Sequence, residues 1–134
     1  MSPRPPVSDA EREVMFVLWE HGPQIVRGVQ EGLAARGFDW QRSTVITLLQ
    51  RLEKKGYVAS DRTRHAYIFR ASVSRDELVN QRLREVADDL CEGTAAPLLL
   101  AFARQQDLTP NELADLRRLV DELSARQTDK KRSR

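Results

Sequence analysis

The sequence predicts a mainly α-helical chain with one small β-hairpin: a winged helix-turn-helix domain followed by a helical dimerisation region. Three observations indicate this fold class. Helical patterns follow one another over residues 8–55, the hydrophobic period changes to two over residues 57–70, and helical periodicity returns after residue 74. Three helices followed by a hairpin are typical of winged-helix proteins, whose third helix enters the major groove of DNA.

The first helix is expected to begin at a capping box. Ser8 would accept a hydrogen bond from the backbone of Glu11, whose side chain would return one to residue 8. The sequence His-Gly-Pro at residues 21–23 would end the helix. Its inner stripe contains three aliphatic residues, Val14, Val17 and Leu18.

A second, shorter helix is expected over residues 24–36. Two glycines, Gly28 and Gly32, lower its helix propensity, so packing must hold it. Its apolar positions are four residues apart and share one face: Ile25, Val29 and Leu33.

The third helix has the cleanest apolar period in the chain. We expect it to start after Ser43, whose capping role would be compatible with DNA contact, and to end at Gly56. Two short strands should follow, at residues 57–61 and 66–70, around a basic tip at residues 62–65. The inward positions of the helix are spaced by three or four residues: Val45, Leu48, Leu49 and Leu52.

The domain organisation follows from these elements. Residues 1–73 form the predicted winged-helix DNA-binding domain, residues 74–127 the helical dimerisation region, and residues 128–134 a basic disordered tail. The dimerisation region is expected to contain a helix opening at Ser74, a short apolar helix around residues 97–102, and a last helix that begins at Thr109 with proline in its first turn.

This C-terminal region is too small and too apolar to be stable as an isolated domain, which predicts a homodimer. The apolar positions that open it are spaced by 4, 3 and 4 residues, a pattern suited to a partner helix. The residues predicted to form the dimer interface are Val79, Leu83, Val86, Leu90, Leu98, Leu99, Phe102, Leu113, Leu116, Leu119, Val120 and Leu123.

Positive charge is concentrated where DNA would be met. Residues 41–70 hold seven basic against two acidic residues, a net charge of +5, whereas residues 74–127 hold seven against eleven, a net charge of −4. The third helix offers short polar side chains and cations on its outer face. The predicted base-reading residues are Arg42, Ser43, Thr44, Ile46 and Thr47, and the predicted phosphate-binding residues are Gln50, Arg51, Lys54, Lys55, Arg62, Arg64 and His65. A solvated helix face is the alternative explanation for these cations, and the basic hairpin that follows favours DNA.

Other function classes find no support in the residue pattern. The one cysteine, Cys91, excludes an intrachain disulfide and should be partly buried, and His21 and His65 have no acidic or thiol ligands at metal-binding spacing. Trp40 is expected in the core or as a packing lid, with base stacking as the alternative. No nucleophile motif or phosphate-binding glycine loop is found, so we predict neither an enzyme nor a cofactor.

No membrane or export signal is evident. No apolar run approaches the roughly 20 residues that span a bilayer, and the N-terminus lacks the apolar stretch of a signal peptide. We therefore expect a cytoplasmic protein.

A family resemblance covers nearly the whole chain. It rests on Ser8-Asp-Ala-Glu11, Val14-Met15, Val17-Leu-Trp-Glu20, Gly22-Pro23, Trp40, Thr44-Val45, Thr47-Leu48-Leu49, Arg51-Leu52, Lys54-Lys55-Gly56, Arg64, Tyr67, Phe69, Leu108-Thr109, Glu112-Leu113 and Leu116. These residues resemble the penicillinase-repressor family of the BlaI, MecI and CopY type. The resemblance implies a homodimer that binds double-stranded palindromic operators and represses β-lactamase, antibiotic-resistance or copper-homeostasis genes.

Members of the resembled family respond to two kinds of signal, and this chain departs from the pattern of each. In β-lactam-responsive members, a membrane sensor peptidase pathway leads to cleavage at an Asn-Phe bond in the dimerisation region; the matching bond here joins Ala101 to Phe102, so the Phe is kept and the Asn is not. Dimer core is the alternative role for this segment. Copper-responsive members carry paired Cys-x-Cys motifs, which a chain with one cysteine lacks.

Together these features predict a sequence-specific, dimeric transcriptional repressor. The alternative is a winged-helix interaction module whose basic face binds an acidic protein partner.

Overall fold

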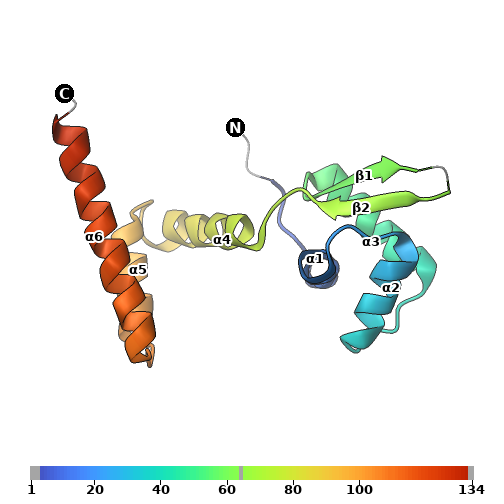
Figure 1. The fold of residues 1–134 in the computed structure, drawn as a ribbon, viewed down its shortest axis with the longest axis horizontal. Coiled ribbons are helices and arrows are strands. Elements are labelled where there is room, and N and C mark those ends of the chain that lie inside the picture. The colour runs from blue at the N-terminus through green and yellow to red at the C-terminus, as the bar shows by residue number, and fades with distance from the viewer. Residues whose placement is uncertain (1–3, 64, 133–134) are drawn as a thin grey trace. The chain divides into compact units, whose positions relative to one another are not determined.

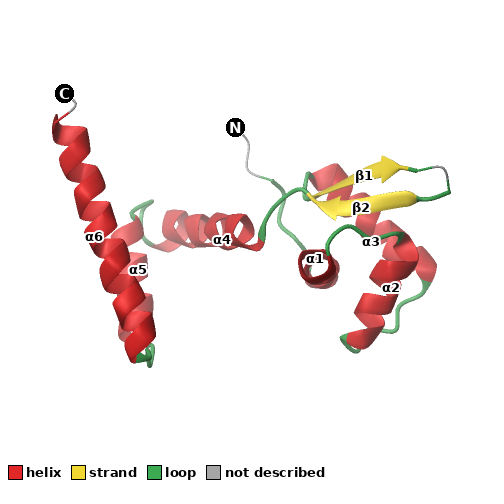
Figure 2. Ribbon diagram, in the orientation of Figure 1, coloured by secondary structure: helices red, strands yellow, loops and turns green. Residues whose placement is uncertain are grey.

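The computed structural model describes residues 4–63 and 65–132 (Figures 1 and 2). The chain divides into two compact units, Met1–Val86 and Ala87–Arg134. The elements, in order, are α1 (Asp9–His21), α2 (Val26–Ala35), α3 (Arg42–Lys55), β1 (Val58–Arg62), β2 (Tyr67–Ala71), α4 (Arg75–Leu90), α5 (Ala95–Arg104) and α6 (Pro110–Arg132). The first unit thus has three helices followed by a hairpin, which confirms the predicted winged-helix order.

The predicted capping box at the start of α1 is confirmed. The backbone N–H of Glu11 donates to Ser8 Oγ at 3.2 Å, and the N–H of Ser8 donates to Glu11 Oε1 at 2.8 Å. Gly22 ends the helix with φ of 78°, a left-handed value that glycine adopts without a steric cost. Val14, Val17 and Leu18 are buried, as predicted.

Helix α2 is shorter than the sequence predicted. Gln24 is paired with Phe69 of the hairpin through two backbone hydrogen bonds of 2.9 and 2.8 Å, so it lies outside the helix. Ile25 is the N-cap residue and is 43% exposed, which corrects its expected place on the buried face. Gly32 lies against α1, since a Cβ there would come within 2.5 Å of Val17 Cγ1. Packing therefore holds this helix, as expected.

Helix α3 begins before Ser43, which corrects the predicted start. Its N-cap residue is Gln41, and no side chain caps this end, so Ser43 lies in the first turn and does not act as a cap. Gly56 ends the helix in the left-handed conformation with φ of 92°. The predicted inward residues are all buried: Val45, Leu48, Leu49 and Leu52.

The hairpin starts one residue later than predicted because Tyr57 completes the end of α3. Its N–H donates to Leu52 O at 2.9 Å, and its ring is fully buried. Strands β1 and β2 are antiparallel, with Val58 opposite Ala71. At the tip, the Thr63 N–H donates to the carbonyl of residue 66 at 2.8 Å and closes the turn.

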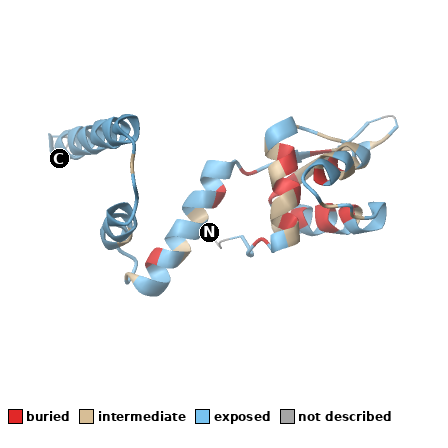
Figure 3. Cartoon of the chain, turned by 90° about the horizontal axis from the view of Figure 1, so that it is seen from below, coloured by how far each residue is buried: buried red, intermediate tan, exposed pale blue. Residues whose placement is uncertain are grey.

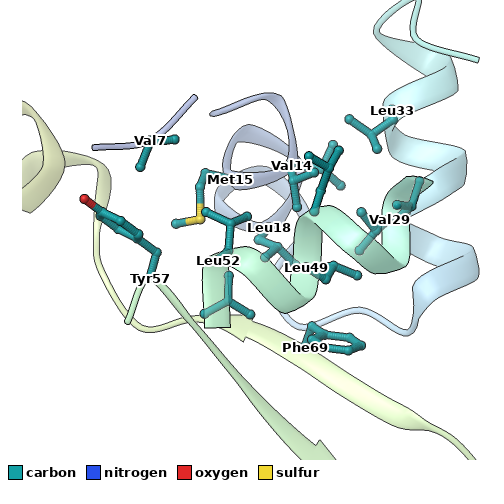
Figure 4. Close-up of a cluster of buried hydrophobic side chains, with 14 of the residues drawn as sticks. Val7, Val14, Met15, Leu18, Val29, Leu33, Leu49, Leu52, Tyr57 and Phe69 are labelled. Atoms are coloured by element: carbon teal, nitrogen blue, oxygen red, sulfur yellow. The ribbon is translucent and has the colours of Figure 1, made fainter. Parts of the chain in front are cut away.

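The core lies between α1, α2, α3 and the base of the hairpin (Figures 3 and 4). It also takes in Leu78 of α4, which is why the first unit extends past the boundary predicted at residue 73. Trp19 Nε1 donates to Val73 O at 2.8 Å, and Gln81 Nε2 donates to Tyr57 Oη at 2.9 Å. These bonds attach the first half of α4 to the winged helix.

The C-terminal helices begin at the predicted caps. Ser74 Oγ accepts from the Glu77 N–H at 3.0 Å, and Thr109 and Glu112 exchange hydrogen bonds of 2.9 and 3.1 Å. Helix α6 continues to Arg132, which corrects the expected disorder of residues 128–132. Basic residues in its last turn complement the negative end of the helix dipole, and this favours the helix there. Cys91 is half-buried, as predicted.

Candidate nucleic-acid interface

The outer face of α3 is polar and open to solvent. Because Val45, Leu48, Leu49 and Leu52 point inward, the 100° turn per residue places Ser43, Thr47, Gln50 and Lys54 on the opposite ridge. All four residues of this ridge are exposed. The Thr47 hydroxyl donates to Ser43 O at 3.0 Å, which holds it beside the helix backbone.

The remaining predicted base-reading residues lie on the two flanks of this ridge. Arg42 and Ile46 line a groove of about 720 Å³ that α3 shares with α2 and the hairpin. Thr44 and Arg51 lie on the other flank, beside Thr47. The predicted residues thus form one surface that runs along the exposed side of α3.

The groove beside α3 has basic residues on its walls. Arg27 of α2, Arg42 of α3 and His65 of the hairpin line it. Glu53 is the carboxylate among its described lining residues, and it accepts a hydrogen bond from Ser60 Oγ. This bond orients the carboxylate, whose negative charge remains in the groove.

The residues predicted to bind phosphate differ in their exposure and in their contacts within the fold. In the described part of the chain, Arg51 and Lys54 form no ion pair and are exposed. Arg62 stacks over the Tyr67 ring, with 5.8 Å from its Cζ atom to the ring centroid. His65 is exposed at the hairpin tip, whereas Arg64 lies outside the described residues.

Lys55 is already paired within the fold. Its Nζ atom lies 2.6 Å from Glu11 Oε1 and 2.9 Å from Pro6 O. Burial alone would raise the pKa of Glu11, but the hydrogen bonds from Lys55 and Ser8 outweigh it and hold the pKa below its usual value. We therefore leave Lys55 out of the surface proposed to contact DNA.

Sequence reasoning missed Arg27 and Tyr67, which line the groove beside α3. Tyr67 is 51% exposed and extends the face of β2 that Phe69 buries in the core, with ring centroids 6.5 Å apart. The spacing of two aromatic residues at i and i+2 was the available signal. No comparable signal marks Arg27, which pairs with Glu31 across one helical turn at 3.1 Å.

The remaining observations concern the packing of Trp40, metal sites and membrane-spanning helices. Trp40 packs on Phe38, with ring centroids 5.0 Å apart, and both rings contact the core, so the predicted packing role of Trp40 is confirmed. Among the described residues, no group of histidine, cysteine and acidic side chains has the arrangement of a metal site. Within the same residues, no helix is long and apolar enough to cross a membrane.

The C-terminal helices expose the apolar side chains predicted for dimerisation. The α6 residues are between 41% and 58% exposed, Phe102 of α5 is 67% exposed, and Leu98 is half-buried. In Figure 3 this part of the chain is drawn almost entirely in the colour of exposed residues. The exposed apolar residues of α6 are Leu113, Leu116, Leu119, Val120 and Leu123.

The chain is similar to known proteins over most of its length. The sequence model of the penicillinase repressor family matches residues 7–122. The penicillinase repressor of Bacillus licheniformis is 25% identical over 118 residues, 88% of this chain and 91% of that protein. The transcriptional regulator BlaI of Mycobacterium tuberculosis is 37% identical over 123 residues, 89% of this chain and 86% of that protein. The solution structure of the DNA-binding domain of the repressor BlaI matches with a TM-score of 0.50 and 30% identity, covering 57% of this chain and 93% of that chain.

Proposed function

The chain belongs to the penicillinase repressor family, and we propose on this premise that it represses transcription by occupying palindromic operators as a homodimer. Proteins of this family are transcriptional repressors rather than enzymes. The observation that carries the proposal is the outer face of α3, where exposed polar residues lie beside cations that form no ion pair with any described residue.

Different residues of the α3 surface would contact the bases and the phosphates of DNA. Thr47 and Ser43 lie on the exposed ridge near the start of the helix, where short side chains can reach base edges in the major groove. Arg51 and Lys54 lie further along the helix, where the groove walls are phosphate. The basic residues of the hairpin, Arg62 and His65, would contact the DNA backbone beside the groove.

The proposed dimer buries the apolar faces of α5 and α6. An apolar row along a 23-residue helix is unusual on the surface of a monomer and is typical of a protein interface. Val86 and Leu90 at the end of α4 are exposed as well. A two-fold dimer would present two copies of α3 to half-sites about one helical turn of DNA apart, or a multiple of it.

We also propose that proteolysis in α5 relieves repression. The bond between Ala101 and Phe102 lies inside α5, and both residues are exposed. A protease binds an extended backbone, so α5 would have to unwind before cleavage. We propose resistance or stress genes as the regulated targets, because relatives include a methicillin resistance regulatory protein.

The first experiment measures affinity for DNA from the protein's own promoter region against shuffled DNA at two salt concentrations. Tight, selective and salt-sensitive binding supports an operator-binding repressor. Weak, unselective binding would contradict the proposal and favour a protein-interaction module.

Two neighbouring variants on α3 separate base reading from phosphate binding. Arg51→Ala should weaken binding to operator and shuffled DNA alike and reduce the salt slope by about 0.9, the value for one phosphate contact. Thr47→Ala should lower the preference for operator over shuffled DNA and leave the salt slope unchanged. Equal specificity ratios in Thr47→Ala and the unaltered protein would reject base reading at this position.

A further inference from the structure

One groove of the first unit lies away from α3 and combines apolar walls with arginines. It has a volume of about 370 Å³ and lies between α1 and the first half of α4. A concave site of this size, with mostly apolar walls and a few converging polar groups, has the general properties of a small-molecule site. Its lining residues are Arg12, Phe16, Trp19, Arg75, Leu78, Val79, Arg82 and Leu83.

Arg75 is held at the groove by two aromatic rings. Its guanidinium lies 5.4 Å from the Phe16 ring centroid and 5.6 Å from that of Trp19. It forms no ion pair in the described part of the chain, and these aromatic rings hold it beside the groove. A guanidinium in this position has free N–H groups arranged to bind a carboxylate with two parallel hydrogen bonds.

The other two arginines add to the positive potential of the groove. Within the described part of the chain, Arg82 donates one N–H, to Val7 O at 3.0 Å, so most of its donors remain available. Arg12 contacts Asp9 at 3.4 Å, and that carboxylate is almost fully exposed, so the pair is weak. Among the described residues that line the groove, none is acidic.

We propose that this groove binds a small aromatic carboxylate, with the ring against Phe16, Trp19 and Leu78 and the carboxylate on Arg75. Val79 and Leu83, which the sequence predicted for the dimer interface, line this groove, but charge favours such an anion over a second copy of the chain. If the same groove of a second copy were to pack against this one, three arginines would face three others, and none of the described residues that line the groove is acidic.

The position of the groove suggests a regulatory role, and this part of the inference rests on the proposed function. One wall is α1 of the winged helix, and the other is α4, which continues past Val86 into the second unit. A ligand between them would change the direction in which α4 leaves the first unit. Because the spacing of half-sites is fixed by the DNA, such a change alters the operator affinity of a dimer.

The test titrates 1-naphthoate and its neutral analogue 1-naphthamide into the full chain by isothermal titration calorimetry. We expect one naphthoate site per chain and roughly tenfold weaker binding of the amide, which lacks the charge-assisted hydrogen bonds. Arg75→Gln should remove this preference. The matched control is Arg104→Gln, an exposed arginine of α5 outside the groove, which should keep it.

Two results would overturn the assignment. One is equal binding of naphthoate and naphthamide, or a preference that survives in Arg75→Gln. The other is rapid disulfide formation between copies of Leu83→Cys, made in a Cys91→Ser background, that naphthoate does not slow; the groove would then be an interface between chains. A chain that binds naphthoate as expected but shows no operator preference would instead refute the proposed function alone.

Discussion

The same substitution at two adjacent lysines at the end of α3 should affect different properties of the protein. Lys55 donates to the carboxylate of Glu11, which is 1% exposed, and the Lys55 side chain itself is 26% exposed. Lys54 is exposed and has no ion pair in the described part of the chain. We predict that Lys55→Met lowers stability and that Lys54→Met lowers DNA affinity.

The size of each change in stability depends on the interactions that remain after the substitution. In Lys55→Met the buried carboxylate of Glu11 keeps its bonds to Ser8 but loses its counterion, a change that costs about 3–5 kcal/mol for a fully buried pair. Water can reach the exposed part of Lys55, so we expect roughly 2–3 kcal/mol. For a unit of this size, that corresponds to a fall in Tm of about 10–20 °C. Lys54→Met should change stability by less than about 0.5 kcal/mol.

The cost of Lys55→Met should depend on pH. In the folded chain the pKa of Glu11 is raised by burial and lowered more strongly by Lys55 and Ser8, so it lies below the ordinary value of 4.5. A depressed carboxyl pKa contributes stability above the unfolded value, and this contribution is lost as pH falls through the folded value. The difference in stability between the two proteins should therefore be largest at neutral pH and shrink below about pH 4.5.

Urea denaturation followed by circular dichroism and DNA titrations by fluorescence anisotropy measure both properties. The reasoning is refuted if Lys55→Met unfolds at the same urea concentration as the unaltered chain, or if its salt slope falls as that of Lys54→Met does. A stability difference that does not change between pH 7 and pH 4 would refute the role assigned to Glu11.

Three further outcomes are expected. Gly32→Ala should lower the free energy of unfolding by about 1–3 kcal/mol, because the new Cβ would lie 2.5 Å from Val17 Cγ1; a gain in urea resistance, as helix propensity alone predicts, would contradict this packing. Leu119→Asp should convert the proposed dimer to monomer by placing a charge on the apolar face of α6, and an unchanged mass in sedimentation equilibrium would count against that interface. Ser8→Ala should cost about 1 kcal/mol through the lost cap of α1, visible as a lower Tm, and an unaltered Tm would show that the cap contributes nothing.

Local patterns predicted most of the elements of the first unit. The buried period of α3 and the capping box of α1 involve residues within a few positions of each other, so they could be read directly. The errors lie where distant residues decide. Gln24 leaves α2 because Phe69, 45 positions away, offers both backbone hydrogen bonds. Strand β1 starts late because Tyr57 turns into the core.

In the candidate site, too, local sequence predicted some features and distant residues decided others. That α3 has one apolar and one polar face followed from its sequence period, and so did the choice of its outer residues as DNA contacts. Arg27 and Tyr67 could not be added, because only the fold brings α2 and the hairpin to the side of α3.

By itself, the sequence determined the order of the elements, the exposed polar face of α3, the apolar faces of the C-terminal helices and the family. Only the tertiary structure decided which cations are free. Lys54 and Lys55 are indistinguishable in the printed sequence, yet one is exposed and the other is paired with Glu11, 44 positions earlier. The physical reason is the cost of burying a carboxylate: once the fold encloses Glu11, it needs a counterion, and Lys55 is the lysine that reaches it.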